Sequence, residues 1–294
     1  MALFAKRGLK AIILIERKSD KELFNPLATG FLVGFLLNKD PDPLKSTYRI
    51  FLVTNRHVFE GLDELWIRFD KKESAGTARF PLRLSENGEN KWLAHKDQEV
   101  DLAMVTINAN FLNENGIDWT FFNEERFAYP EQFSKIGIEL GDEIFLAGFP
   151  MGISGDIQNY AIVRKGSIAR VDSEIIKVNK SFLIDAFVFP GNSGGPVLLK
   201  PEISSLENTK AVNSVYVLGV VSGYKVYKEP LFSHQSNPPE IAAISIENSG
   251  LASVVPMNFT KDIYQDFIEK QKKLEEEIKG KNEIIQEKIE ASQK

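Results

Sequence analysis

The stretch that decides the fold is Phe189-Pro190-Gly191-Asn192-Ser193-Gly194-Gly195-Pro196-Val197. Glycine reaches backbone dihedrals closed to other residues, so the N–H of Gly191 can turn toward the same point as that of Ser193, with Asn192 between them. Two amides that converge beside a nucleophile stabilise the oxyanion of an attacked carbonyl. A serine hydroxyl is a weak nucleophile until an adjacent base takes its proton. The stretch therefore predicts a nucleophilic serine, provided that the chain also supplies a base.

The chain has three histidines, and one of them is a candidate base. His57 ends the apolar run Ile50–Val58, whereas His95 and His234 have polar neighbours and are expected at the surface. Read alone, a histidine at a strand end is more often structural than catalytic. Its catalytic role therefore depends on the other residues that meet it.

The candidate orienting acid is Asp101, which begins the apolar run Asp101–Val105. A partly buried carboxylate needs a cationic or N–H partner, because an unpaired one costs several kcal/mol. His57 would satisfy that need, and Asp101 would then hold the imidazole in one tautomer with its other nitrogen toward Ser193. An isolated Asp at this position would instead be interpreted as the cap of a turn.

Three segments together resemble the motifs of chymotrypsin-fold serine proteases, in that family's chain order. They are Thr54-Asn55-Arg56-His57-Val58, Asp101-Leu102-Ala103-Met104-Val105 and Gly191-Asn192-Ser193-Gly194-Gly195-Pro196. The first and the last are most similar to the HtrA branch, and the likeness covers roughly residues 8–268. Where that branch usually carries a PDZ domain, this sequence predicts a helix.

The resemblance implies an all-β fold of two six-stranded antiparallel β-barrels, about residues 8–130 and 135–256, with the site in the cleft between them. It implies a catalytic triad of His57, Asp101 and Ser193, and an oxyanion hole made by Gly191 and Ser193 with Asn192. Digestive relatives carry Asp at the position of Asn192 to pair with a newly cleaved N-terminus, so activation by that ion pair is not expected here.

The resemblance also implies a set of substrate-binding residues, one of which, Ser222, supports the triad carboxylate in the family. The set is Phe187, Val188, Val221, Ser222, Gly223 and Tyr224. It offers no Asp for a basic side chain, so we expect cleavage after Val, Ala, Leu or Thr and not after Lys or Arg. The alternative is that Phe187 fills the primary specificity pocket.

Up to about residue 255, short apolar runs alternate with turns, which is typical of an all-β sandwich or a pair of barrels. A loop is predicted over Pro230–Glu240. The predicted strands are Lys10–Ile15, Ala28–Leu37, Tyr48–Thr54, Glu64–Phe69, Ala78–Leu84, Val100–Ile107, Glu143–Gly148, Tyr160–Val171, Glu174–Val178, Phe182–Phe189, Pro196–Leu199 and Val215–Ser222.

The sequence changes character near Asn258, so we divide the chain into a protease domain over 1–258 and a helical tail over 259–294. Ile263, Leu274 and Ile285 recur at an eleven-residue spacing, close to the period of a straight helix. The simplest interpretation is an amphipathic helix whose first turns pack on the domain. The alternative is that the apolar residues of the distal part of this helix mediate self-association or partner docking.

Composition excludes several classes of function. The formal net charge of −5 provides no basic surface for nucleic acid, and no apolar run approaches the roughly 20 residues of a membrane span. The absence of cysteine, the scattered histidines and the lack of phosphate-loop or dinucleotide motifs predict neither a metal nor another cofactor. With no signal peptide recognised, we predict a cytoplasmic location.

The leading hypothesis is a serine endopeptidase that acts on proteins or peptides through an acyl-enzyme. Two alternatives stay open at this point. The chain could be a binding module that retains the protease fold. It could also be a latent protease that a partner activates through the C-terminal helix.

Overall fold

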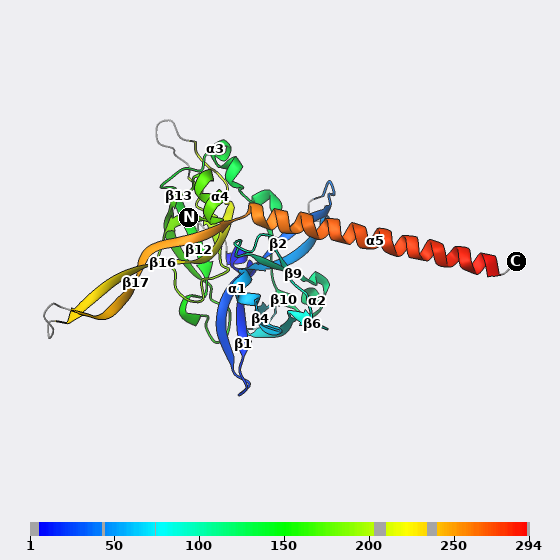
Figure 1. Cartoon of the computed structure of the whole chain (residues 1–294), viewed down its shortest axis with the longest axis horizontal. Helices are drawn as coiled ribbons and strands as arrows, with labels where there is room; N and C mark the ends of the chain where they lie inside the picture. Colours follow the sequence, from blue (N-terminus) through cyan, green and yellow to red (C-terminus); the bar gives the residue numbers. More distant parts are fainter. Residues whose placement is uncertain (1–5, 43–44, 74, 203–209, 234–239, 293–294) are drawn as a thin grey trace.

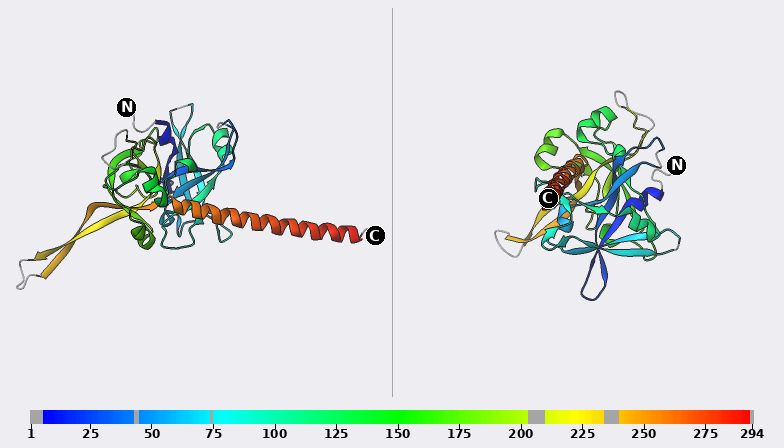
Figure 2. Two further views of the ribbon diagram at one scale, coloured as in Figure 1. Left: turned by 90° about the horizontal axis from the view of Figure 1, so that it is seen from above. Right: turned by 90° about the vertical axis from the view of Figure 1, so that its right-hand side faces the viewer.

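The computed structural model describes residues 6–292 except 43–44, 74, 203–209 and 234–239, with only the backbone described for residue 240 and for 281–292. Two β-rich halves pack against each other (Figure 1). Helix α5 (Asn258–Ser292) leaves this body at one end, and a two-stranded arm leaves it at the opposite end (Figure 2).

The first half is built on one mainly antiparallel sheet. Its strands are β1 (Ile12–Lys18), β2 (Phe24–Asn38), β3 (Thr47–Thr54), β4 (Glu64–Lys71), β5 (Thr77–Arg83), β8 (Leu93–Ala94), β9 (Ala103–Ile107), β10 (Ile117–Asp118) and β11 (Phe122–Asn123). The order is β10-β4-β1-β2-β3-β9-β8, with β5 paired to β4 and β11 paired in parallel to β2. A separate hairpin consists of β6 (Ser85–Glu86) and β7 (Glu89–Asn90).

This half differs from the closed six-stranded barrel implied by the family resemblance. Between the residues that the structure describes, the ladders run from β5 and β10 at one edge to β8 at the other without joining the two edges. The segment between β5 and β9 contributes only the two-residue β8 to the sheet, because β6 and β7 pair with each other. With so few ladder hydrogen bonds from this segment, the two edges of the sheet stay apart among the described residues.

The second half is a closed barrel in the order β12-β13-β14-β17-β16-β15. Its strands are β12 (Glu143–Gly148), β13 (Ile162–Arg170), β14 (Phe182–Asp185), β15 (Pro196–Leu199), β16 (Val217–Ser233) and β17 (Glu240–Pro256). The bounds of β12 and β15 are those predicted from the sequence. One of the two expected barrels is therefore present.

Two segments of the second half adopt structures other than those predicted. The predicted strand Glu174–Val178 lies in helix α4 (Ser173–Asn179), which buries Ile176 and leaves Val178 exposed. The predicted loop Pro230–Glu240 instead begins inside β16 and ends at the first residue of β17, with 234–239 outside the described residues. Beyond the barrel, β16 and β17 pair as far as Ser233 and Glu240, and this extension is the two-stranded arm of Figure 1.

The other α-helices in the described part of the chain are α1 (Arg56–Phe59), α2 (Ala109–Glu114) and α3 (Phe133–Ile136). Short 3-10 helices span Lys6–Ala11, Glu124–Arg126, Pro130–Gln132 and Pro150–Gly152. Each half has its own apolar core, and a third cluster joins the halves and the start of α5. In α5, Ile263 is buried, and the ring of Tyr264 stacks on Phe35 with 4.0 Å between centroids. Leu274, further along the helix, is exposed. No helix in the described part of the chain is long and apolar enough to cross a membrane.

Candidate active site

The pairing of β3 with β9 brings His57 and Asp101 together. Thr54, the last residue of β3, lies opposite Ala103, the first residue of β9. The chain turns directly after β3 into the single-turn helix α1, which carries His57, and Asp101 lies two residues before β9. Two side chains 44 residues apart in sequence therefore start from adjacent strand ends.

Both oxygens of the Asp101 carboxylate accept hydrogen bonds from His57. The ring Nδ1 lies 2.8 Å from Oδ2, and the backbone N–H of His57 donates to Oδ1 over 3.1 Å. The Asn55 side chain also donates to the Asp101 carbonyl, which fixes the backbone there. The hydrogen bond with Asp101 raises the pKa of His57 above its ordinary value of 6.5; burial opposes this shift, and the charges of Asp101 and Glu60 add to it. The side chain is half-exposed, and among the described residues no hydrogen bond engages its Nε2.

Ser193 lies in the turn between β14 and β15, and this turn packs against the end of β3. The Thr29 amide on β2 donates to the Ser193 carbonyl over 2.9 Å. A Cβ on Gly194 would overlap with the Thr54 hydroxyl, so only glycine lets the turn approach so closely to the strand that leads to His57. In the part of the chain that the structure describes, no hydrogen bond joins the side chains of Ser193 and His57.

The directions of the Gly191 and Ser193 amides are fixed by hydrogen bonds to the carbonyls that precede them. Pro190 accepts a hydrogen bond from the Met151 amide over 2.6 Å, and Asn192 accepts one from the Gly195 amide over 2.9 Å. A trans peptide points its N–H away from its own carbonyl, so both amides point away from these partners. Neither donates a hydrogen bond among the described residues. Two unused donors therefore lie in the serine turn, one on Ser193 itself and one two residues before it.

Thr29 is a central contact of this turn that the sequence reasoning missed. Its hydroxyl donates to the Gly191 carbonyl over 2.6 Å and accepts from the Phe149 amide over 3.0 Å, and its carbonyl accepts from the Thr54 hydroxyl. The residue is fully buried. A polar side chain inside the apolar run Ala28–Leu37 was the available signal, because buried hydroxyls require partners.

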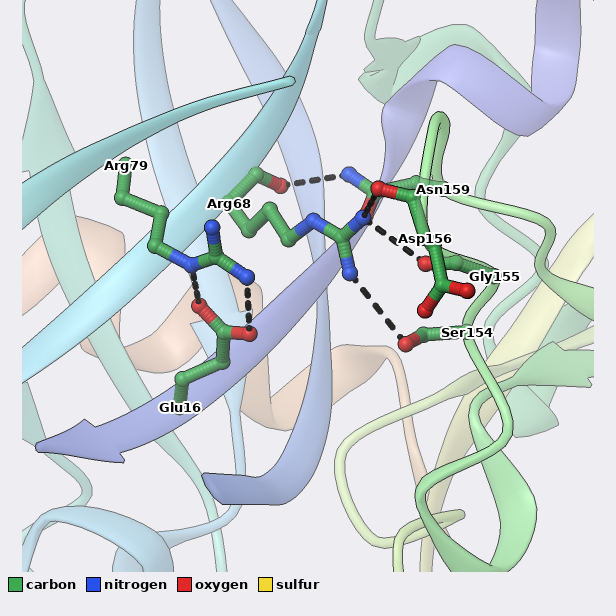
Figure 3. A network of polar contacts seen from close by, with 7 residues as sticks. All are labelled: Glu16, Arg68, Arg79, Ser154, Gly155, Asp156 and Asn159. Carbon is green, nitrogen blue, oxygen red and sulfur yellow. Dashed lines mark hydrogen bonds and ion pairs between the residues drawn. The ribbon is translucent and has the colours of Figure 1, made fainter. Parts of the chain in front are cut away.

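The loop between β12 and β13 is fixed to the first half by a polar network (Figure 3). The buried guanidinium of Arg68 donates to the Ser154 hydroxyl and to the carbonyls of Gly155 and Asp156 over 2.8–3.2 Å. Asn159 donates from its side chain to the Arg68 carbonyl and from its backbone to Asp70. Met151 begins the same loop with left-handed backbone dihedrals. Strand β4 is thus connected through this loop to the Pro190 carbonyl.

Other sequence-predicted residues have the following positions. The buried Asn192 side chain faces inward, where its oxygen accepts from the Phe189 amide. The Ser222 hydroxyl donates to the Ser253 carbonyl and not to Asp101. His95, expected at the surface, is buried beside Phe259 with its Nε2 3.8 Å from Asp262 of α5; the expectation missed this docking of the helix. His234 lies outside the described residues.

The predicted substrate-binding residues divide into exposed and buried ones. Phe187 is half-exposed, and its ring lies against Gly250. Tyr224 is also exposed, and Gly223 has open space where a side chain would be. Val188 and Val221 belong to the core of the second barrel. Among the described residues, no three His, Cys, Asp or Glu side chains gather as a metal site would require.

These features define a β-protein with a serine turn and a His–Asp pair between two halves, and the comparisons with known proteins agree. Residues 28–201 match the family model described as the trypsin-like peptidase domain. The chain belongs to this family. Over 130 residues it is also 32% identical to a serine protease DegP homolog of Plasmodium falciparum (isolate 3D7), a match that spans 42% of this chain and 12% of that protein. The resemblance to HtrA-like serine proteases is thereby confirmed.

Proposed function

We propose that the chain is a serine endopeptidase with His57, Asp101 and Ser193 as its catalytic triad. The observation that carries this proposal is the two-point contact of His57 with Asp101, at the strand end against which the Ser193 turn packs. The free amides of Gly191 and Ser193 support it, because they are suitable oxyanion donors.

The mechanism follows from which atoms are already engaged. Because Asp101 occupies Nδ1, the Nε2 of His57 takes the proton of Ser193 as Oγ bonds to the substrate carbonyl carbon. The amides of Gly191 and Ser193 hold the resulting oxyanion. The imidazolium then gives its proton to the leaving amine as the C–N bond breaks, which leaves an acyl-enzyme. Water, deprotonated by the same nitrogen, hydrolyses the ester and restores Ser193.

The proposed substrate preference rests on the exposed residues near this turn. Phe187, Gly223 and Tyr224 present apolar or open surface without a carboxylate, which favours a small or medium apolar residue before the scissile bond. Val188 and Val221 are buried in the barrel core, where they support the surface formed by these three residues. We assign these roles to a protease domain over 1–258, and a separate tail function to 259–294.

Hydrolysis of an unbiased peptide library tests this proposal. Cleavage after Val, Ala, Leu or Thr is expected for the wild type, with loss of turnover in Ser193→Ala. Dominant cleavage after Lys or Arg would contradict the proposed specificity. Undiminished hydrolysis by Ser193→Ala would contradict the proposed nucleophile.

A further inference from the structure

The arm formed by the distal parts of β16 and β17 has one apolar face. Cross-strand partners share a face of the ribbon, so the register pairs Lys228 with Ile246, Pro230 with Ile244 and Phe232 with Ile241 on the same side as Val226. The opposite face carries Glu229, Ser245 and Glu247 among Tyr227, Leu231 and Ala243. We call the first surface the apolar arm face; it comprises Val226, Lys228, Pro230, Phe232, Ile241, Ile244 and Ile246.

Nothing in the described part of the chain covers the apolar arm face. Its Val, Phe and Ile side chains are 46–63% exposed, and the arm projects away from both halves of the body (Figure 1; Figure 2). Side chains of this kind offer about 100 Å² each, so the face approaches the largest apolar patches of ordinary monomers. An isolated two-stranded ribbon is marginally stable in water. An apolar face on such a ribbon is therefore expected to be covered by a binding partner.

The position of the arm indicates what it binds. Strand β16 pairs with β15 only over Val217–Val220, and the backbone of Val221 is held by Gly194 and Gly195. Over Ser222–Glu229, no described strand pairs with the edge of β16 opposite β17. This open edge begins beside the residue that follows Ser193 and continues into the arm. If a polypeptide binds with its scissile bond at Ser193 and follows this edge, it therefore reaches the arm.

We propose that the arm is a binding site for the extended, apolar segment of a protein substrate on the amino side of the scissile bond; this inference rests on the proposed peptidase function. The substrate strand adds antiparallel to the open edge, as in β-augmentation. The missing N–H of Pro230 sets the end of that ladder near Glu229. Alternate substrate side chains then extend the apolar arm face.

The closing experiment compares three substrates that contain the same short cleavage sequence. One is a minimal peptide, one carries about ten alternating apolar and polar residues on its amino side, and one carries them on its carboxyl side. We expect the amino-side extension alone to raise kcat/KM at least about tenfold, mainly through KM. Ile244→Asp/Ile246→Asp should abolish this gain and leave hydrolysis of the minimal peptide unchanged.

The matched control is Ala243→Asp/Ser245→Asp, which places the same charges on the same strand but on the opposite face of the ribbon, and it should keep the gain. An equal gain from either extension, or a gain that survives Ile244→Asp/Ile246→Asp, would overturn the proposal. So would a wild-type dimer that this substitution converts to a monomer, because a second copy would then occupy the face. Fluorescence anisotropy of the amino-extended peptide with full-length Ser193→Ala separates this inference from the proposed function. Binding lost only on substitution of the apolar arm face supports the arm even without turnover.

Discussion

The Thr29 hydroxyl donates a 2.6 Å hydrogen bond to the carbonyl of Gly191, 162 residues away in sequence. The two residues belong to different halves of the molecule, so this contact fixes one face of the candidate oxyanion hole against the other half. The same hydroxyl accepts from the Phe149 amide, at the start of the loop whose Met151 amide holds the Pro190 carbonyl. One buried side chain therefore contacts both the serine turn and the start of the loop that holds the Pro190 carbonyl.

Replacing Thr29 should impair turnover more than substrate binding. Thr29→Val removes the hydroxyl but keeps the branched shape, so the Gly191 peptide loses its support. We expect kcat to fall about 10- to 100-fold, less than the direct loss of an oxyanion donor, with KM little changed. Steady-state kinetics would measure the split. Thr29→Ser, which retains the hydroxyl, should restore kcat; failure of this rescue would contradict the positioning role.

The acid limb of the activity profile should lie above pH 6.5. His57 must be neutral to accept the Ser193 proton, and the Asp101 hydrogen bond raises the His57 pKa. Activity therefore increases as pH rises through that raised value. The free energy of unfolding changes with pH in the opposite direction. The His57–Asp101 pair stabilises the fold below the ordinary histidine pKa, and this contribution is lost as pH rises through the pKa of His57 in the folded protein.

Asp101→Asn tests this assignment. The midpoint of the kcat/KM profile should move to lower pH, because the carboxylate that favours the imidazolium is gone. The plateau should fall by about 10⁴, as when such a triad loses its carboxylate. A midpoint at an unchanged pH would show that Asp101 does not control the titrating group.

Loosening the loop between β12 and β13 should also reduce the reactivity of Ser193. Arg68→Gln removes the guanidinium contacts to Ser154, Gly155 and Asp156 (Figure 3). We expect slower covalent labelling of Ser193 and faster nicking within 150–161 by an added protease, because local opening becomes easier. The control is Glu16→Gln/Arg79→Gln, which removes the neighbouring ion pair without touching the loop. Equal effects of both variants would contradict a specific role for Arg68.

The first turns of α5 should stabilise the body, while its exposed stripe should not. Ile263 is buried in the cluster that joins the two halves, so Ile263→Ala should cost about 2–5 kcal/mol of unfolding free energy. Ile278 is half-exposed on the same helix, and Ile278→Ala should change stability by less than about 0.5 kcal/mol. Chemical denaturation measures both. A similar loss in each variant would indicate that the distal stripe is covered in solution.

The sequence was most informative where chemistry requires particular residues at one place. His57, Asp101 and Ser193 lie in short motifs whose spacing reflects strand ends and tight turns, and the structure brings His57 and Asp101 into contact. Thr29 and Arg68 could not be assigned in the same way. Their roles depend on partners more than 80 residues away, and no local pattern encodes such contacts.

Secondary structure was hardest to predict where local propensity and tertiary packing disagree. Ile175, Ile176 and Val178 favour a strand by their branched side chains, but of the three only Ile176 is buried, and the short helix α4 achieves that. The loop over Pro230–Glu240 was predicted from Pro238 and Pro239, which lie outside the described residues. Pro230 itself lies in β16, because proline is tolerated on an open strand edge, where no ladder hydrogen bond is lost.

The proposed function is tested most directly by covalent labelling with a fluorophosphonate, followed by mass spectrometry of the modified peptide. A functional triad requires one adduct per folded wild-type chain, on Ser193, with no adduct in Ser193→Ala and strongly slowed labelling in His57→Ala. A folded wild type that stays unlabelled, or an adduct that persists in Ser193→Ala, would contradict the assignment of Ser193 as the nucleophile.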